Sequence, residues 1–324
     1  MILVTGGAGF IGSCLQGQLS ALGWETVIAD ELGSGDKWRN IARHPPARIV
    51  APGDLDDFLD SHPPLETIFH LGAISSTTAT NGDEVWRTNV DLPRRLWEWC
   101  AHRRVRFIYA SSAATYGEGA DGFDDDPAKL DQLKPLNLYG WSKHVFDMQV
   151  AKMLARGEPS PPQWAGLKFF NVYGPNEYHK GKMISVVKVK YDDIKAGNKP
   201  KLFRSTRTGL ADGAQARDFV HVDDAVKVML WLLKNPGVCG LFNVGTGVAR
   251  SYLDLAHAVC DAAGVAREIE FVDMPGILLG KYQDFTCAPM QRLRDAGYDA
   301  PFIGLEEGIE SYVRNHLSAE DPYR

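Results

Sequence analysis

The chain has 324 residues, of which 44% are hydrophobic and 23% are charged, and its formal net charge is −6. These values are typical of a soluble globular protein that is long enough for two domains and a sizeable core. The sequence has no long basic tract and no apolar run that approaches the length of a membrane span. Nucleic acid and membranes are therefore not expected partners.

Cysteine and histidine patterns argue against a disulfide framework and against a metal site. The five cysteines are odd in number and far apart in the sequence, and the nine histidines show no ligand spacing such as HExxH. Residues 1–7 run straight into a strand-like segment and lack the features of a signal peptide. We expect reduced cysteines, no metal and a cytoplasmic location.

In chain order, short apolar runs alternate with helical stretches through the first half of the sequence. The apolar runs predict strands at residues 1–6, 25–30, 67–73, 106–112 and 165–174. The helical spacing predicts helices at residues 12–23, 85–103 and 138–156. Such alternation is the pattern of βαβ units, so we predict an α/β fold with a Rossmann-type, doubly wound parallel sheet.

The alternation breaks after residue 174. A helix is expected at 188–198 outside the sheet, whereas 217–235 and 240–247 are expected to return a strand, a helix and a strand to the main domain. A final helical and loop region begins at 251. We therefore predict a smaller, interleaved C-terminal substrate domain. Its expected boundaries are 172–214 and 248–324, and those of the main domain are 1–171 and 215–247.

A glycine-rich turn follows the first expected strand and opens the first helix. Gly6, Gly9 and Gly12 have a GxxGxxG spacing within "VTGGAGFIGS". Glycines there permit a tight turn and let backbone N–H groups approach a pyrophosphate at the helix N-terminus. An acidic residue, Asp30, ends the second strand, as this fingerprint requires. The sequence therefore predicts a dinucleotide-binding site.

The residues after the second strand bear on the choice between NADP and NAD. Asp30 suits a ribose hydroxyl, and Lys37 and Arg39 can neutralise a 2′-phosphate, which favours NADP. Glu31, also at this site, would repel that phosphate and favours NAD. Both lysine and arginine can equally be solvated loop residues. NADP is the prediction, with NAD as the alternative.

A tyrosine and a lysine lie one helical turn apart in "YGWSK". On a helix, Tyr139 and Lys143 share one face. A phenol is a poor base at neutral pH, but a neighbouring ammonium favours its phenolate, so that the pair can exchange a proton with an alcohol. Ser111 and Ser112 end the strand at 106–112, where a hydroxyl can hold the same substrate oxygen. Together with the glycine fingerprint, this combination predicts that the pair is functional in proton exchange with a substrate.

These motifs together resemble the extended short-chain dehydrogenase/reductase family over essentially the whole chain. The segments "TGGAGFIGS", "SSAATYG", "YGWSK", "NVYGP", "RDFVHVDD" and "FNVGTG" occur in the order of that family. Many of its members are nucleotide-sugar epimerases and dehydratases. Within the family, "NVYGPNEYHKGKM", "PKLF" and "GKYQDFT" look most like an epimerase that inverts C6 of an ADP-heptose for the lipopolysaccharide core.

The resemblance implies roles for individual residues. Those expected to contact NADP, besides the three glycines and Glu31, are Phe10, Ile11, Asp30, Lys37, Leu71, Gly72, Ala73, Ile74, Ser75, Asn89, Tyr139, Lys143 and Val172. Those expected to hold the nucleotide-sugar substrate are Ser112, Asn171, Lys182, Phe203, Arg217 and Tyr282. Arg217 suits the ADP pyrophosphate as a charge-assisted fork. The resemblance also implies a homo-oligomer, a pentamer.

Epimerisation at an unactivated carbinol carbon requires two acid/base groups. The carbonyl formed by hydride removal must present its other face to the same hydride, so its oxygen changes place. Tyr139 can serve one oxygen position, and a second group must serve the other. Lys180 lies in the loop that leaves the strand at 165–174, where doubly wound folds build substrate sites. The resemblance supports Lys180 in this role; His179 can instead pack or orient the loop.

The sequence also bears on other functions within this fold. A sugar-nucleotide dehydratase of this family carries an Asp-Glu pair just after the strand serine, but this chain has Ala113 and Ala114 there. A non-catalytic NAD(P)-binding regulator would not need Ser112, Tyr139 and Lys180. Epimerisation of an ADP-heptose is therefore the favoured prediction. The alternatives are another NAD(P)-dependent nucleotide-sugar epimerase or a dehydratase of the same family, or a non-catalytic NAD(P)-binding regulator.

Overall fold

The computed structural model describes residues 1–276 and 283–324. Its centre is a seven-stranded sheet in which every pair of neighbouring strands is parallel. The strands, in spatial order, are β10 (Gly240–Val244), β6 (Trp164–Phe169), β5 (Arg106–Ser112), β4 (Thr67–His70), β1 (Ile2–Thr5), β2 (Thr26–Ala29) and β3 (Arg48–Val50). The sheet order reverses at β1, which confirms the predicted doubly wound fold.

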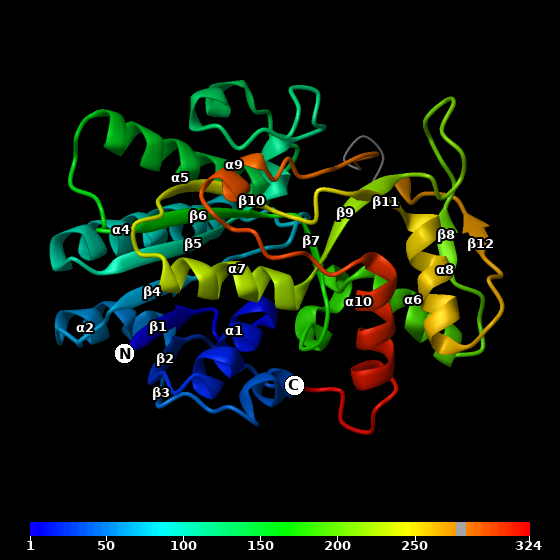
Figure 1. Cartoon of the computed structure of the whole chain (residues 1–324), viewed down its shortest axis with the longest axis horizontal. Coiled ribbons are helices and arrows are strands. Elements are labelled where there is room, and N and C mark those ends of the chain that lie inside the picture. Colours follow the sequence, from blue (N-terminus) through cyan, green and yellow to red (C-terminus); the bar gives the residue numbers. More distant parts are fainter. Residues whose placement is uncertain (277–282) are drawn as a thin grey trace.

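Both faces of this sheet are covered by helices, as Figure 1 shows. Ile2 and Val4 of β1 pack against α1 (Phe10–Ala21) and α7 (Val222–Lys234) on one face. Leu3 packs on the opposite face, against α4 (Leu92–Arg103) and α5 (Leu138–Ala155). Alternate side chains of a strand point to opposite faces, so a fully apolar strand is the sequence that a sheet covered on both faces requires.

The predicted helix at 85–103 is interrupted in the structure. A short helix, α3 (Gly82–Trp86), leads into a π-helical turn, η3 (Arg87–Asp91), and only then into α4. The predicted strand at 165–174 is likewise two strands, β6 and β7 (Asn171–Tyr173), which belong to different sheets. The remaining short elements are η1 (Asp36–Ile41), η2 (Pro52–Asp54), α2 (Leu55–Asp60), η4 (Ala113–Tyr116), η5 (Pro127–Gln132), η6 (Tyr178–Met183) and α9 (Gln291–Asp295).

A smaller region lies at the right of Figure 1 and has its own apolar core. Its three-stranded sheet has the order β11 (Ala249–Ser251), β9 (Ala216–His221) and β7, and a two-stranded sheet pairs β12 (Glu270–Val272) with β8 (Lys201–Phe203). The helices packed there are α6 (Val186–Lys195), α8 (Tyr252–Ala263), α10 (Leu305–Tyr312) and the π-helical η8 (Val313–Leu317).

The strand and the helix formed by the segment 217–235 belong to different regions of the structure. Its strand, β9, does not join the main sheet but pairs with β7, which continues directly from β6. Its helix, α7, packs on the main sheet, and the strand that follows, β10, extends that sheet beside β6. The domain boundaries themselves stay a prediction.

Candidate active site

A cavity of about 590 Å³ lies at the carboxyl ends of the main strands and is closed on its other side by the smaller region. Its walls include Gly6 after β1, Asp30 after β2, Leu71 after β4 and Ser112 at the end of β5. From the other side it is lined by residues of β7, η6, α6 and α8. This is the edge of a doubly wound sheet at which ligands bind.

The glycine-rich turn forms one wall of the cavity. Gly6 has a φ of +67°, and a side chain there would meet the backbone of Gly72 at 2.7 Å. A Cβ at Gly12 would lie 2.1 Å from the carbonyl oxygen of Gly6, so the helix packs too closely for any other residue. Helix α1 begins at Phe10 with no side-chain cap and no acidic residue in its first turn. The first N–H groups of α1 thus suit a pyrophosphate.

Asp30 and Lys37 both line the cavity and bind each other. One carboxylate oxygen of Asp30 accepts the N–H of Ala8 at 2.8 Å, and the other lies 2.5 Å from the Lys37 Nζ. Lys37 also donates to the carbonyl oxygen of Glu31 at 2.7 Å. The Glu31 side chain is exposed and is not part of the cavity wall. A carboxylate and an ammonium therefore stand together where a ribose with or without a 2′-phosphate would lie.

Most of the predicted loop at 71–75 lines the cavity, but Ile74 does not. Its N–H and its carbonyl oxygen are each 2.9 Å from the side-chain amide of Asn89, in the π-helical turn η3. Asn89 is fully buried and also donates to the Ser142 hydroxyl at 3.0 Å. Asn89 therefore lies behind the wall and ties the loop to α5, while Val172 does line the cavity.

Tyr139, Lys143 and Ser112 meet at one wall of the cavity. The start of α5 is capped by Asn137, whose side chain accepts the N–H of Gly140 at 2.9 Å. A Cβ at Gly140 would lie 2.5 Å from the carbonyl oxygen of Ala114, so only glycine lets the first turn of α5 pack against the turn after β5. This close packing brings Tyr139 beside Ser112.

The charges of this wall are set mainly by burial. Burial lowers the pKa of Lys143 to about 8, although the nearby Asp147 opposes the change. Burial raises the pKa of Tyr139, and its hydrogen bond with Ser112 opposes that rise. We expected the neighbouring ammonium to favour the phenolate, but desolvation of the phenol is the larger effect in this structure.

Behind this wall lies a fully buried ion pair. The Lys168 Nζ is 3.0 Å from Asp147 and donates to the Thr115 hydroxyl at 2.8 Å. Asp147 also accepts from the hydroxyls of Ser111, at 2.7 Å, and of Tyr109, at 3.0 Å. Ser111 and Ser112 thus belong to a strand end that is fixed by charge-assisted hydrogen bonds.

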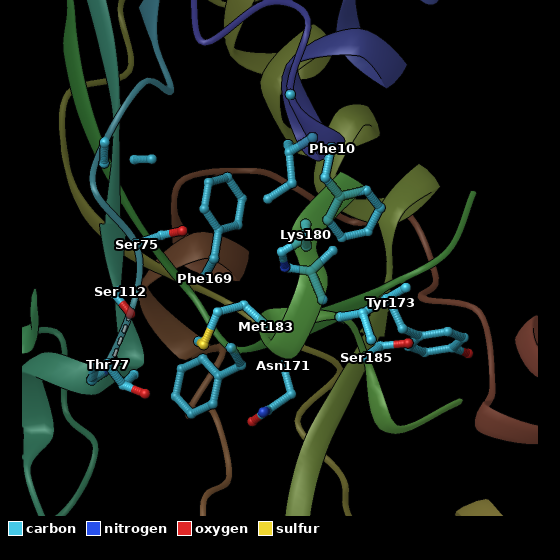
Figure 2. Close-up of a pocket in the computed structure, with 18 of the residues that line it drawn as sticks. Phe10, Ser75, Thr77, Ser112, Phe169, Asn171, Tyr173, Lys180, Met183 and Ser185 are labelled. Atoms are coloured by element: carbon cyan, nitrogen blue, oxygen red, sulfur yellow. Dashed lines mark hydrogen bonds between the residues drawn. The ribbon is translucent and has the colours of Figure 1, made fainter. Parts of the chain in front are cut away.

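Lys180 points into the cavity beside Phe10, as Figure 2 shows. Its Nζ lies 5.1 Å from the centre of the Phe10 ring. Burial lowers the pKa of Lys180, and Glu177 opposes the change. Gly181, which follows Lys180, has a φ of +53°, a backbone conformation that glycine adopts readily and other residues rarely do.

Glu177 closes the Lys180 loop at its base, a role that sequence reasoning missed. Its side chain is buried and accepts from the N–H of Ser185 at 2.7 Å and from the Ser185 hydroxyl at 2.6 Å. The Tyr312 hydroxyl of α10 donates to the same carboxylate at 3.1 Å. An acidic residue in a polar loop usually indicates a solvated side chain, so the local sequence contained no signal for this contact.

Only some of the residues predicted to hold substrate line the cavity. Asn171 and Lys182 line the cavity. The Arg217 guanidinium lies 5.6 Å from the centre of the Tyr252 ring and donates to the carbonyl oxygens of Ala216 and Gln283; Arg217 itself is not part of the wall. Phe203, at the end of β8, is also outside the wall. Tyr282 falls within 277–282, outside the described residues.

Several wall residues were not predicted. They include Thr77, Phe169, Phe170, Tyr173, Met183, Ser185, Tyr252 and Gln283, whereas His179, whose role was left open, also lines the wall. The aromatic ones belong to apolar runs that predict only buried strands and helices.

Within residues 1–276 and 283–324, no group of three His, Cys, Asp or Glu side chains is arranged to hold a metal ion. The same part of the chain has no helix that is both long and apolar enough to span a membrane.

Comparisons with known proteins agree with this geometry. ADP-L-glycero-D-manno-heptose-6-epimerases of Nitratidesulfovibrio vulgaris and Fusobacterium nucleatum are 47% and 42% identical to this chain, each over 100% of both sequences. The crystal structure of the Helicobacter pylori enzyme of that name has a TM-score of 0.79 at 27% identity and covers 98% of this chain and 96% of its own. The similarity to ADP-heptose epimerases that the sequence predicted is thus confirmed.

Other solved structures bear on the cofactor. A Thermus thermophilus UDP-glucose 4-epimerase in complex with NAD superimposes with a TM-score of 0.78 at 26% identity, covering 98% of this chain and 99% of its own. Together with the glycine-rich wall, this likeness supports a nicotinamide cofactor. The model of the NAD dependent epimerase/dehydratase family matches residues 2–245. The chain belongs to the NAD dependent epimerase/dehydratase family.

Proposed function

We propose that the protein inverts C6 of ADP-D-glycero-D-manno-heptose to give ADP-L-glycero-D-manno-heptose. The observation that carries the proposal is that two acid/base groups, Tyr139 and Lys180, line one cavity from separate elements. An epimerase that acts through a ketone needs a group that accepts the hydroxyl proton at one oxygen position and a group that donates a proton at the other. Relatives that span the whole chain are named as enzymes of this reaction.

NADP is the proposed cofactor, held by the glycine turn, Asp30 and Lys37. When bound, the nicotinamide would supply reversible hydride transfer, so that the sugar is oxidised only transiently. Lys37 supports NADP because its ammonium already lies at the ribose end of the wall, 2.5 Å from Asp30. Glu31 is exposed outside the wall, which weakens its expected repulsion of a 2′-phosphate.

Tyr139 would take and return the hydroxyl proton at the first oxygen position, and Ser112 would hold the same oxygen by a hydrogen bond. Lys143 lies one turn further along α5, where its charge favours the phenolate once a substrate hydroxyl approaches. Burial gives Lys143 a pKa of about 8, so it keeps most of its charge at neutral pH. These three groups form the first proton-transfer centre.

Lys180 would serve the oxygen in its second position. Its lowered pKa increases the neutral fraction that can accept a proton. Asn171 and Lys182, in the same wall, are proposed to hold the sugar nucleotide. Arg217, Phe203 and Tyr282 stay proposed contacts of the nucleotide half.

The dehydratase alternative is disfavoured by the wall beside Ser112. Ala113 and Ala114 both line the cavity there, and neither can supply the acid or the base that elimination of water requires. A non-catalytic regulator is disfavoured because Tyr139, Lys143 and Lys180 are all present in the wall. A cytoplasmic homo-oligomer, a pentamer, is proposed with the epimerase function and is tested by light scattering.

The experiment is incubation of the purified protein with ADP-D-glycero-D-manno-heptose, followed by NMR analysis of the C6 configuration. We expect both C6 epimers at equilibrium and no accumulation of NADPH, because the hydride returns to the sugar. Sustained, stoichiometric NADPH formation would instead identify a dehydrogenase. Release of water with formation of a deoxy sugar would identify a dehydratase.

A further inference from the structure

The segment Asp321–Arg324, here named the tail, lies against two loops of the cavity that are distant from it in the sequence. Figure 1 shows the C-terminal end beside the blue N-terminal part of the chain. The two loops are η1, which contains Lys37, and η6, which contains Lys180. The tail itself does not line the cavity.

The contacts with η1 are made by Asp321 and Tyr323. The two carboxylate oxygens of Asp321 lie 3.0 Å from Arg39 and 2.9 Å from Arg43. The Arg39 guanidinium also lies 4.3 Å from the centre of the Tyr323 ring. The ion pairs are exposed, so solvent screens them and they contribute little to stability. The Tyr323 ring is 7% exposed, so its burial is the stronger part of this contact.

The contacts with η6 are made by Pro322 and by the same tyrosine. The Tyr178 hydroxyl donates to the Pro322 carbonyl oxygen at 2.9 Å. The rings of Tyr178 and Tyr323 meet edge to face, with centres 5.1 Å apart. Tyr178 lies two residues before Lys180. The Tyr323 ring therefore touches one residue of each loop, Arg39 and Tyr178.

A buried junction beneath the tail joins the same two loops. Asn176 is fully buried with a φ of +72°, a conformation that is uncommon for a residue other than glycine. Its amide donates to the Ser13 hydroxyl at 3.0 Å and to the Asn40 carbonyl oxygen at 3.2 Å, and its Oδ1 accepts the N–H of Arg324 at 3.0 Å. The tail thus supplies the last hydrogen bond of a residue held in a strained conformation.

Asn40 continues the junction to the glycine turn and to the Lys180 loop. Its side-chain amide donates to the Ala8 carbonyl oxygen at 2.9 Å and lies 3.1 Å from the His179 Nδ1. Burial and the charges of Lys37 and Lys180 lower the pKa of His179, which keeps its ring neutral and able to accept. On the other side of the junction, the Arg324 guanidinium binds Asp223 at the start of α7.

We propose that the tail is a positioning element that holds the Lys180 loop against η1, and that Tyr323 is its main residue. This proposal rests on the proposed function, because it takes Lys180 to be the second acid/base. Tyr139 stands on α5, which is anchored separately by Asn137 and Gly140. Loosening the tail should therefore impair the proton transfer at Lys180 and spare the one at Tyr139.

The test compares Tyr323→Ala with Tyr323→Phe, which keeps the ring. Each sugar epimer is mixed separately with the NADP-loaded enzyme, and reduction of bound cofactor is followed near 340 nm in a single turnover. Lys180→Met identifies which epimer depends on Lys180. We expect Tyr323→Ala to slow that half-reaction by about 10-fold to 100-fold, the cost of a small misplacement, and to leave the other nearly unchanged. Tyr323→Phe should behave like the wild type.

A second measurement needs neither substrate nor cofactor. Hydrogen exchange of the unliganded protein should increase together in 36–41 and 176–185 in Tyr323→Ala, and not in α8 or in Tyr323→Phe. Equal slowing of both half-reactions, or faster exchange in the tail alone, would overturn the proposal. If the wild type does not act on ADP-heptose, the proposed function fails, and exchange alone decides the proposal. If Tyr323→Ala does not fold, Tyr178→Phe is judged by the same criteria; it keeps the ring and loses the hydroxyl that bonds to Pro322 and to Tyr312.

Discussion

Replacing Lys180 by methionine removes the proposed second proton-transfer group and should leave its surroundings nearly unchanged. The methionine side chain can still pack beside Phe10, whose ring centre is 5.1 Å from the Lys180 Nζ. Glu177 loses a neighbouring charge but keeps its hydrogen bonds from Ser185 and Tyr312. Because burial already penalises the ammonium, we expect the free energy of unfolding to change by less than about 1 kcal/mol.

The catalytic cost should be much larger. Loss of a general acid/base typically lowers the rate about 10²-fold to 10⁴-fold, or about 2.7–5.5 kcal/mol in activation free energy. Tyr139→Phe should lower overall epimerisation by a similar factor. In single turnovers near 340 nm, each variant should retain the half-reaction of a different epimer. Lys182→Met is the matched control, since it lies two residues away in the same wall and should mainly raise KM.

The pH dependence provides a further check on Lys180. As a base it must be neutral, so the half-reaction that depends on it should rise with pH up to its lowered pKa and then level off. In Lys180→Met this rise should be absent. Near-normal epimerisation by Lys180→Met, with an unchanged pH profile, would refute the reasoning and leave Lys180 a loop residue of the wall.

Three further predictions follow from the wall and the core behind it. Lys37→Glu replaces the ammonium beside Asp30 by a second carboxylate, so in fluorescence titrations it should weaken the binding of NADP far more than that of NAD. Equal weakening of both would contradict NADP selectivity. Asp147→Asn should lower the free energy of unfolding in urea by about 3–5 kcal/mol, since it leaves the buried Lys168 ammonium without its carboxylate, and adding Lys168→Met should restore part of the loss. A lysine in the unfolded chain stays protonated up to about pH 10.4, whereas Lys143 in the folded protein does so only up to about pH 8. The free energy of unfolding should therefore rise with pH between these two values, and a Lys143→Met variant should lack that rise.

The sequence predicted those parts of the fold that depend on local pattern. Largely apolar runs such as 2–5 predict strands of a sheet covered on both faces, and these runs form the central sheet. The edge strand β3 was missed because it is only three residues long and buries only Val50, so its short apolar stretch gives no clear strand pattern. The pairing of β9 with β7 was also missed, because no local pattern specifies which of two sheets a strand joins.

In the candidate site, too, the sequence predicted what depends on local pattern and missed what depends on distant contacts. The glycine turn and the Tyr139–Lys143 pair were recognised because their chemistry is encoded by spacing within one turn and one helix. Asn89 was expected to face a ligand, but its polar groups are used within the protein, on Ile74 and Ser142. A side-chain amide has the same donors and acceptors for either use, so residue type alone cannot distinguish them.

Long-range positioning had no local signal at all. Asn176 and Arg324 are 148 residues apart in the sequence, and Tyr178 and Pro322 are 144 apart, yet both pairs are hydrogen-bonded. A polar loop and a polar chain end each predict solvated residues when they are considered alone. Only when the fold brings them together does burial of Asn176 and Tyr323 become favourable, because each then finds the partners that water would otherwise supply. The residues proposed to carry proton transfer could thus be recognised in the sequence, whereas the residues proposed to hold Lys180 in place depend on contacts that the fold creates.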